Sequence, residues 1–328
     1  MNRRAPVIAV AVLQVAVLAY MAAEREIVLR TGRTVWLRTA PVDPQDAFRG
    51  DYVSLNYEVS RAPRRLFRDG LAAAKDVRRD MRVYATLKTE AEGISELEYL
   101  SDRRPAGGDF IRGRTEPYSA ADVATVRYGI EALFVQQGKG RVLEDARRRG
   151  DILVPLEMRV AVGANGLCVL RDYRWSRLGI GLKLETNTNR VTRAAVVKLM
   201  NASSNDLAIV DLPGGESLSL ETDWLRSWGE KDWTWVGTDK PRPAVAEEHV
   251  RLLKPGETHE IPVNLMDPAW FVSKPGEKPK PLADLGWGAS FRLVYRPPSA
   301  DECRHLRQSV LIWHGTLSSR AFSGGRID

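Results

Sequence analysis

The sequence predicts a mainly β protein with minor α structure: an N-terminal transmembrane helix, a mixed β-rich domain with two short helices, and then an immunoglobulin-like β-sandwich. Three observations support this fold class. An uncharged apolar run lies near the start of the chain, period-two alternation of apolar and polar residues dominates the rest, and turn residues separate short strand-like segments in the second half. The predicted parts are an anchor or signal peptide at 1–24, a β-rich domain at 25–172, a linker at 173–187 and the sandwich at 188–328.

The apolar run extends from Ala5 to Ala23 and follows Arg3 and Arg4. Its length approaches the ~20 residues that span the hydrocarbon core of a bilayer. Gln14 is its only strongly polar residue. The cationic end is expected to stay in the cytoplasm, so residues 5–23 would cross the membrane once and the bulk of the chain would lie outside the cytoplasm.

A cleaved signal peptide is the alternative to an anchor. Signal peptidase requires small residues at positions −3 and −1 of the cleavage site. Cleavage after Ala22 or Ala23 would place Tyr20 or Met21 at position −3. The sequence therefore favours an uncleaved anchor.

The net charge of the chain limits the classes of partner that it is expected to bind. The net charge of +7 and the pI of about 9.5 are basic, but an exported chain has no access to cellular nucleic acid, so nucleic-acid binding is not expected. The basic charge reflects either contact with anionic lipid head groups or an arginine-rich proteome. Cys168 and Cys303 are too few for a disulfide framework. One bridge between them and two separately buried thiols both remain open.

Within the first domain, two strands at 26–30 and 33–39 flank a predicted hairpin turn at Thr31-Gly32. Helices are predicted at 64–79 and 141–149. Asn165-Gly166 is a strong signal for a tight hairpin between the last two strands. The other predicted strands are 82–88, 95–100, 108–114, 123–128, 131–137, 152–162 and 167–171.

The segment FRGDYVSLNYEVS, residues 48–60, is the most distinctive of the chain. A short helical turn starting at Asp43 is predicted to end at Gly50, which provides a left-handed residue. The chain then alternates as a strand does. Val53, Leu55, Tyr57 and Val59 point to one side, and Tyr52, Ser54, Asn56 and Glu58 point to the other. The polar side is either a solvated face or a binding surface steadied by Asp51.

This segment resembles the signature of the bacterial GDYXXLXY-motif family of membrane-anchored envelope proteins. The matching motif residues are Arg49, Gly50, Asp51, Tyr52, Leu55 and Tyr57, and a second block includes Glu131 and Glu144. The similarity covers about residues 25–171. It implies a single-pass protein of the bacterial inner membrane with most of the chain in the periplasm, and a polytopic membrane protein as its partner. The C-terminal region is not covered by the resemblance.

These observations favour a non-catalytic envelope protein that acts in protein–protein interaction or assembly. The alternative is an extracytoplasmic hydrolase or a glycan-binding module. A weak likeness to signal peptidases suggests a Ser54–Lys88 dyad, although the position of their nucleophile is occupied here by Pro41. Glu131 and Glu144 are a conceivable carboxylate pair, but salt bridges to nearby arginines are the expected use of these two residues. No cofactor or metal is expected, because the four histidines never fall four residues apart.

The second half of the chain is rich in tryptophan. Its predicted strands are 191–200, 206–211, 217–221, 248–253, 259–265, 290–296 and 309–317. A long insertion at 222–246 contains Trp224, Trp228, Trp233 and Trp235, and a second one lies at 267–288. These indoles are predicted to pack within the protein, against the first domain, or to stack on sugar rings of a glycan.

Overall fold

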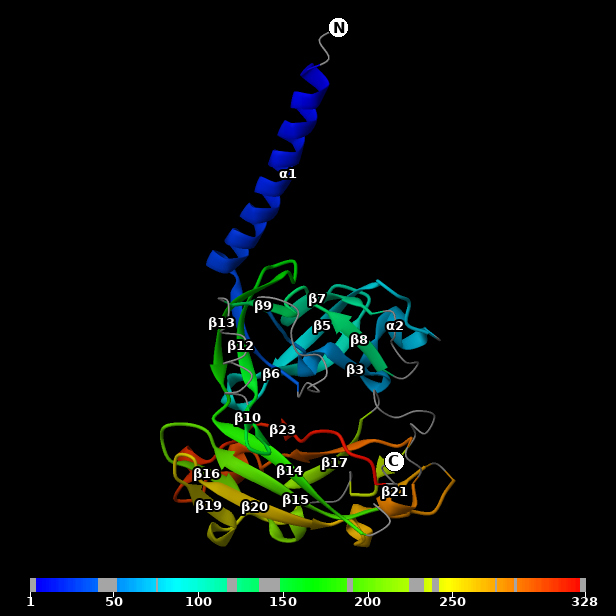
Figure 1. The fold of residues 1–328 in the computed structure, drawn as a ribbon, viewed down its shortest axis with the longest axis vertical. Coiled ribbons are helices and arrows are strands. Elements are labelled where there is room, and N and C mark those ends of the chain that lie inside the picture. The colour runs from blue at the N-terminus through cyan, green and yellow to red at the C-terminus, as the bar shows by residue number, and fades with distance from the viewer. Residues whose placement is uncertain are drawn as a thin grey trace.

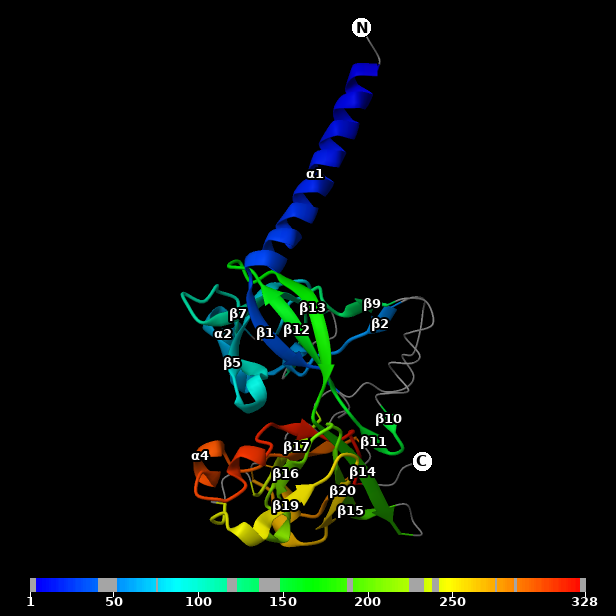
Figure 2. The same cartoon turned by 90° about the vertical axis from the view of Figure 1, so that its left-hand side faces the viewer.

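The computed structural model describes residues 4–40, 52–74, 76–116, 123–135, 148–187, 191–223, 233–237, 242–274, 276–285 and 288–324. Figure 1 shows one long helix projecting from two stacked β-rich parts, and Figure 2 shows the same order from the side. The part next to the helix contains most of residues 33–175, and the far part contains most of residues 178–324. The prediction of a mainly β protein with an N-terminal apolar helix is confirmed.

Helix α1 (Arg4–Thr31) is longer than the sequence predicted. The strand expected at 26–30 is its last turns, and Thr31-Gly32 ends a helix instead of forming a hairpin turn. The physical reason is packing: Val28 is buried against the turn between two strands of the first part, and the Gly32 amide donates to the Val28 carbonyl at 2.8 Å. Residues Val7–Thr31 are long and apolar enough to cross a membrane, a test that a signal sequence also passes.

The first part contains two larger sheets and a two-stranded pair. One sheet has the strand order β1-β12-β13, the second has the order β3-β8-β7-β5-β6-β4, and β2 pairs with β9. The strands are β1 (Arg33–Arg38), β2 (Tyr52–Ser54), β3 (Arg61–Pro63), β4 (Phe67–Arg68), β5 (Arg82–Thr89), β6 (Ser95–Ser101), β7 (Asp109–Thr115), β8 (Val123–Arg127), β9 (Ala132–Phe134), β12 (Leu156–Val162) and β13 (Cys168–Trp175). The hairpin predicted at Asn165-Gly166 is present between β12 and β13, with Gly166 at a φ of 78°.

One apolar core fills the first part, and the sheets on either side contribute Leu37, Met158, Val83 and Ile111 to it. The helix predicted at 64–79 is instead a 3₁₀ turn η3 (Arg64–Leu66), the strand β4 and a short helix α2 (Asp69–Ala73). Phe67 is buried where β4 joins β6, so burial of this side chain prevails over helix propensity. Of the helix predicted at 141–149, residues 141–147 lie outside the described residues, and Arg148–Arg149 form strand β10.

The second part contains two sheets that enclose a single core, together with two small pairs. The larger sheet has the order β10-β11-β14-β15-β20 and the smaller one β17-β22-β23, while β16 pairs with β19 and β18 with β21. The strands are β11 (Ile152–Leu153), β14 (Leu178–Thr186), β15 (Thr192–Asn201), β16 (Leu207–Val210), β17 (Leu218–Thr222), β18 (Thr234–Trp235), β19 (Val250–Leu253), β20 (Thr258–Asn264), β21 (Val272–Ser273), β22 (Phe291–Tyr295) and β23 (Leu317–Ser318). Leu199 from one sheet and Leu293 from the other are fully buried in the shared core, an arrangement of the predicted sandwich type.

Short helical segments connect these strands. They are η2 (Glu58–Ser60) and η4 (Ala91–Gly93) in the first part, and η5 (Pro213–Gly215), η6 (Glu247–His249), η7 (Pro268–Trp270), η8 (Leu282–Asp284), α4 (Ala300–Cys303) and η9 (Ser309–Leu311) in the second. The strand predicted at 309–317 is therefore mostly wrong, since η9 and the two-residue β23 stand in its place.

The segment predicted as a linker, 173–187, contains β14, which pairs along its whole length with β15. Gly179 and Gly181 weakened the strand signal of this sequence. The structure explains them, because a Cβ at either position would lie 2.9 or 3.0 Å from the side chain of Ile152 in the neighbouring strand β11. Only Ser176 and Arg177 separate β13 in the first part from β14 in the second.

Candidate functional site

The motif segment folds into β2 followed by an extended stretch and the turn η2. Val53, Leu55, Tyr57 and Val59 are buried, while Ser54 and Asn56 are exposed. The alternation predicted for this segment is therefore present, although the regular strand ends at Ser54. Tyr52 belongs to β2 and pairs with Phe134. Arg49, Gly50, Asp51 and Glu144, four other residues expected to form the motif site, lie outside the described residues.

Two buried tyrosines tie the motif to the second block of the family signature. The Tyr57 hydroxyl donates to the Ile130 carbonyl at 2.8 Å, and the Tyr128 hydroxyl donates to the Val59 carbonyl at 2.7 Å. Burial raises the pKa of both phenols above the ordinary value, so they stay neutral donors. The two bonds cross between the same pair of segments and fix one against the other.

Glu131 stabilises the turn that carries these contacts. Its carboxylate accepts from the Tyr128 amide at 2.5 Å and the Gly129 amide at 2.9 Å. Its own carbonyl accepts from the Leu55 amide at 2.7 Å. Gly129 has a φ of 79°, a conformation that favours glycine. Glu131 thus precedes β9 as a turn residue, whereas the sequence placed it in a strand.

The catalytic alternative finds no support in the geometry of Lys88. A lysine that acts as a general base needs a pKa lowered by burial. The Lys88 ammonium is exposed and lies 2.6 Å from Glu90, and this hydrogen-bonded ion pair raises its pKa. Ser54 lies on β2, whereas Lys88 lies on β5, and β2 pairs only with β9 within the described part of the chain.

The cysteines and histidines do not gather in one place in the described structure. Cys168 and Cys303 are separate buried thiols. The described residues contain no group of three or more His, Cys, Asp or Glu side chains placed to hold a metal ion. His259 forms a single pair with Asp211, with 2.7 Å between Nε2 and Oδ2.

Trp233 and Trp235 are the two described members of the predicted tryptophan surface, since Trp224 and Trp228 lie outside the described residues. Trp233 is buried in the core of the second part, and the ammonium groups of Lys274 and Lys280 lie 4.3 and 4.4 Å from its ring centroid. The indole therefore packs within the core of its own part.

Trp235 lines a cavity of about 280 Å³ beside β17. Its ring stacks on Trp270 with 5.4 Å between centroids, and its Nε1 donates to the Ala269 carbonyl at 2.8 Å. A Cβ at Gly237 would collide with its six-membered ring. Trp270 therefore occupies a stacking position on this indole, and a sugar could not take that position unless Trp270 moved.

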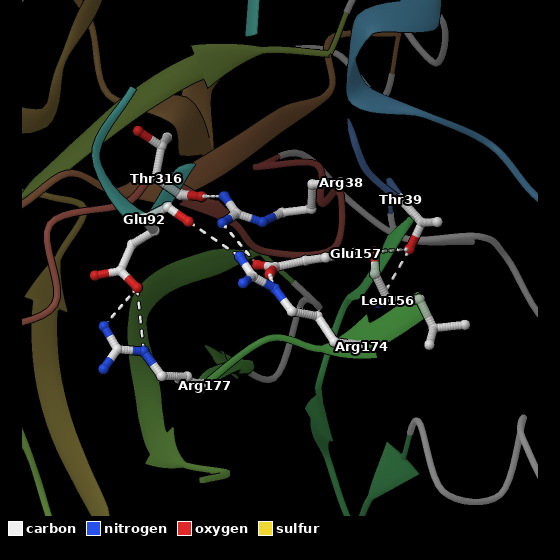
Figure 3. A network of polar contacts seen from close by, with 8 residues as sticks. All are labelled: Arg38, Thr39, Glu92, Leu156, Glu157, Arg174, Arg177 and Thr316. Atoms are coloured by element: carbon white, nitrogen blue, oxygen red, sulfur yellow. Dashed lines mark hydrogen bonds and ion pairs between the residues drawn. The ribbon is translucent and has the colours of Figure 1, made fainter. Parts of the chain in front are cut away.

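The most polar site lies where the two parts meet, and Figure 3 shows its main contacts. Arg38, at the end of β1, is almost completely buried. Its guanidinium donates to the Thr316 carbonyl of the second part and pairs with Glu157 of β12 at 3.1 Å. The side chain lies 5.6 Å from the ring centroid of Trp313, also in the second part. A buried cation thus joins the sheet that follows α1 to the far part of the molecule.

A second arginine completes this site. Arg174 of β13 donates to Glu157 at 2.7 Å and to the Glu92 carbonyl at 3.0 Å. Glu92 in turn pairs with Arg177 at 2.5 Å, in the short connection to β14. Figure 3 shows the three arginines converging on two carboxylates. Nε of Arg38 is buried and has no hydrogen-bond partner among the residues that the structure describes.

Glu58, which follows the motif directly, lies at the same junction. Burial raises its pKa from the ordinary 4.5 to about 7, an effect that Glu96 and Glu157 reinforce and that Arg38 and Arg292 oppose. Arg292 of β22 pairs with Asp223 at 3.0 Å, and Arg61 of β3 reaches the same carboxylate at 4.0 Å. Charges from both parts therefore meet around the end of the motif.

Sequence reasoning did not find the junction site. Leu37, Arg38 and Thr39 are all buried, so this stretch is covered on both faces. Alternation identifies only the face directed to the core of its own part. The signal that was present is the pair of opposite charges, Arg38 and Glu157, beside buried apolar residues of β1 and β12. Its role depends on the second part, which covers it.

Comparison with known proteins identifies the first part. The family model for the GDYXXLXY protein matches residues 14–172, and no match was found among curated proteins or among solved structures. The family suspected from Gly50-Asp51-Tyr52 and Tyr57 is confirmed for this region. Residues 14–172 thus match the family model of the GDYXXLXY proteins, and the sandwich-type second part lies outside the matched region.

Proposed function

We propose that the protein is a non-catalytic, single-pass protein of the bacterial inner membrane whose periplasmic parts bind a protein partner, with a polytopic membrane protein as the partner class. The observation that carries the proposal is the continuity of α1 with the folded part. The helix runs unbroken from the apolar segment through residues 24–31, which contact the β12–β13 turn.

Three contacts hold the base of α1. Val28 is buried against Gly163, and the Glu24 carboxylate accepts from the side-chain amide of Asn165 at 3.2 Å. The guanidinium of Arg171 donates to the backbone carbonyl of Leu29. A signal peptide needs an accessible, extended cleavage region, whereas the residues around Ala22 and Ala23 are helical here. The helix therefore suits an anchor that remains attached to the parts it carries.

A binding role suits the polar groups better than catalysis does. The tyrosines and Glu131 of the motif region are engaged in internal hydrogen bonds, and Lys88 is held protonated by Glu90. These groups build a rigid scaffold and leave no nucleophile paired with a base among them. A rigid scaffold that is anchored in the membrane keeps its binding surface at a fixed distance from a membrane partner, which suits a protein that works by binding another protein.

The anchor is tested by determining the N-terminus and the membrane attachment of the full chain. We expect the wild-type protein to remain in the pellet after an alkaline wash and to retain the residues before Glu24, as mass spectrometry would show. Tyr20→Ala is the matched control, because it places small residues at 20 and 22 and so creates a cleavage motif. A wild-type chain that is released and begins near Glu24 would contradict the proposal.

A further inference from the structure

Gln14 is the unexplained residue of α1. It lies in the middle of the apolar run, its side chain is exposed, and the apolar window of the helix has 0% of its residues buried. A carboxamide carries two N–H donors and an acceptor, and hydrocarbon offers a partner to none of them. Polar residues at this depth of a membrane helix are costly, and amide side chains there form hydrogen bonds between helices.

The residues around Gln14 form a seam, which we define as Val7, Ala11, Gln14, Leu18 and Met21. Their spacing alternates between four and three, so they share one face of a helix that packs against another. All five are exposed. Ala11 lies one turn before Gln14 and is small, which allows a second backbone to approach the carboxamide closely.

The folded part that follows α1 limits what can occupy the seam. Val28 follows Gln14 by two heptads, so it lies on the same face of α1, and it packs on the β12–β13 turn. A second copy laid along this face would carry its own residues 24–31 and its own β12–β13 turn into the same space. A helix that ends at the membrane surface has no such conflict.

Resting on the proposed function, we infer that the seam binds a transmembrane helix of another protein, and that this helix presents a hydrogen-bonding polar side chain at mid-membrane depth to the Gln14 carboxamide. The partner is therefore a membrane-spanning protein recognised within the bilayer. The contact leaves the periplasmic parts free to engage the same partner above the membrane.

The test uses the full-length chain in its native membranes, with a photoreactive phenylalanine analogue introduced at single positions. Ala11 and Leu18 lie on the seam, whereas Val12 and Ala16 lie at nearly the same depth on the opposite face. We expect one adduct of a distinct mass from the two seam positions and none from the opposite pair. Gln14→Leu should lower the adduct yield about three- to tenfold, and Gln14→Asn, which keeps the carboxamide, should largely restore it.

Each other outcome overturns the inference. Adducts with twice the mass of the chain would place a second copy on the seam. Equal labelling from both faces, no adduct at all, or a yield unaffected by Gln14→Leu would exclude recognition through this residue. A chain found free of the membrane would instead refute the anchor itself, so the two failures are distinguishable.

Discussion

The motif region and the junction site use buried polar groups in opposite ways. Around the motif, the Tyr57 and Tyr128 hydroxyls are neutral and each reaches a carbonyl at hydrogen-bond distance. At the junction, Arg38 and Glu157 are buried as a charge pair, and one guanidinium nitrogen has no partner within the described part of the chain. Neutral hydrogen bonds that are fully made give a fixed scaffold, whereas a buried charge pair gives a contact that depends strongly on both of its partners.

This difference separates the role of the signature from the role of the added part. The signature residues hold the family region together internally. Arg38 reaches out of that region to Thr316 and Trp313. The molecule therefore has a scaffold next to α1 that is held by neutral hydrogen bonds, and a contact with the far part that depends on buried charges.

The largest effect is expected from breaking the buried charge pair. Arg38→Met should lower the free energy of unfolding by about 3–5 kcal/mol, because it leaves Glu157 buried with only the more exposed Arg174 to balance it. Urea denaturation measures the change. Arg33→Met is the control, since Arg33 forms an exposed pair with Asp109, and it should cost at most about 1 kcal/mol. Equal effects of the two variants would refute the distinction.

A smaller, pH-dependent effect is expected at Glu58. Its pKa in the folded protein, about 7, exceeds the ordinary 4.5, so the folded state binds the proton more tightly than the unfolded chain does. The resulting stability is fully present below pH 4.5 and is lost as the pH rises to about 7, by up to about 3 kcal/mol.

Glu58→Gln removes this titration. The variant should be more stable than the wild type at pH 8 and nearly equal to it at pH 4.5, which melting temperatures across this range would reveal. If the difference between the two proteins were the same at both pH values, Glu58 would not titrate as described.

The smallest effect is expected in the scaffold. Tyr57→Phe removes one hydrogen bond and leaves the buried Ile130 carbonyl without that donor, so the unfolding free energy should fall by about 1–2 kcal/mol at every pH between 5 and 8. Tyr173→Phe alters a tyrosine that is 37% exposed and should change little. A strong pH dependence of the Tyr57→Phe effect would remove the contrast between scaffold and junction.

The alternation of apolar and polar residues, together with the turn residues, predicted much of this fold, because these patterns indicate which side of a segment is buried in the core of its own part. The buried face of the motif and the hairpin at Asn165-Gly166 follow from alternation and turn chemistry. The end of α1 and strand β14 did not follow, because they depend on contacts with distant segments. The last turns of α1 depend on the packing of Val28 against Gly163. The glycines of β14 are required by the side chain of Ile152, which lies close to both.

The same limit explains the candidate sites. The signature residues identified the family, but their bonds to Ile130 and Tyr128 required the structure. The junction was missed because its charges come from strands of two parts, and a sequence pattern does not state which strands face each other. Gln14 was visible from the start, and only the packing of Val28 indicated what can lie against it.

The unbroken passage from α1 into β1 makes the molecule a lever. Residues 24–31 join the apolar run to β1 and pack along the β12–β13 turn, because Glu24 bonds Asn165 and Val28 packs on Gly163. Because β1 ends at Arg38, and Arg38 touches Thr316, a rotation of the helix is transmitted through β1 to the far part, as well as through the connection from β13 to β14. A partner helix that tilts α1 would thereby move the second part without any change in the fold of either part.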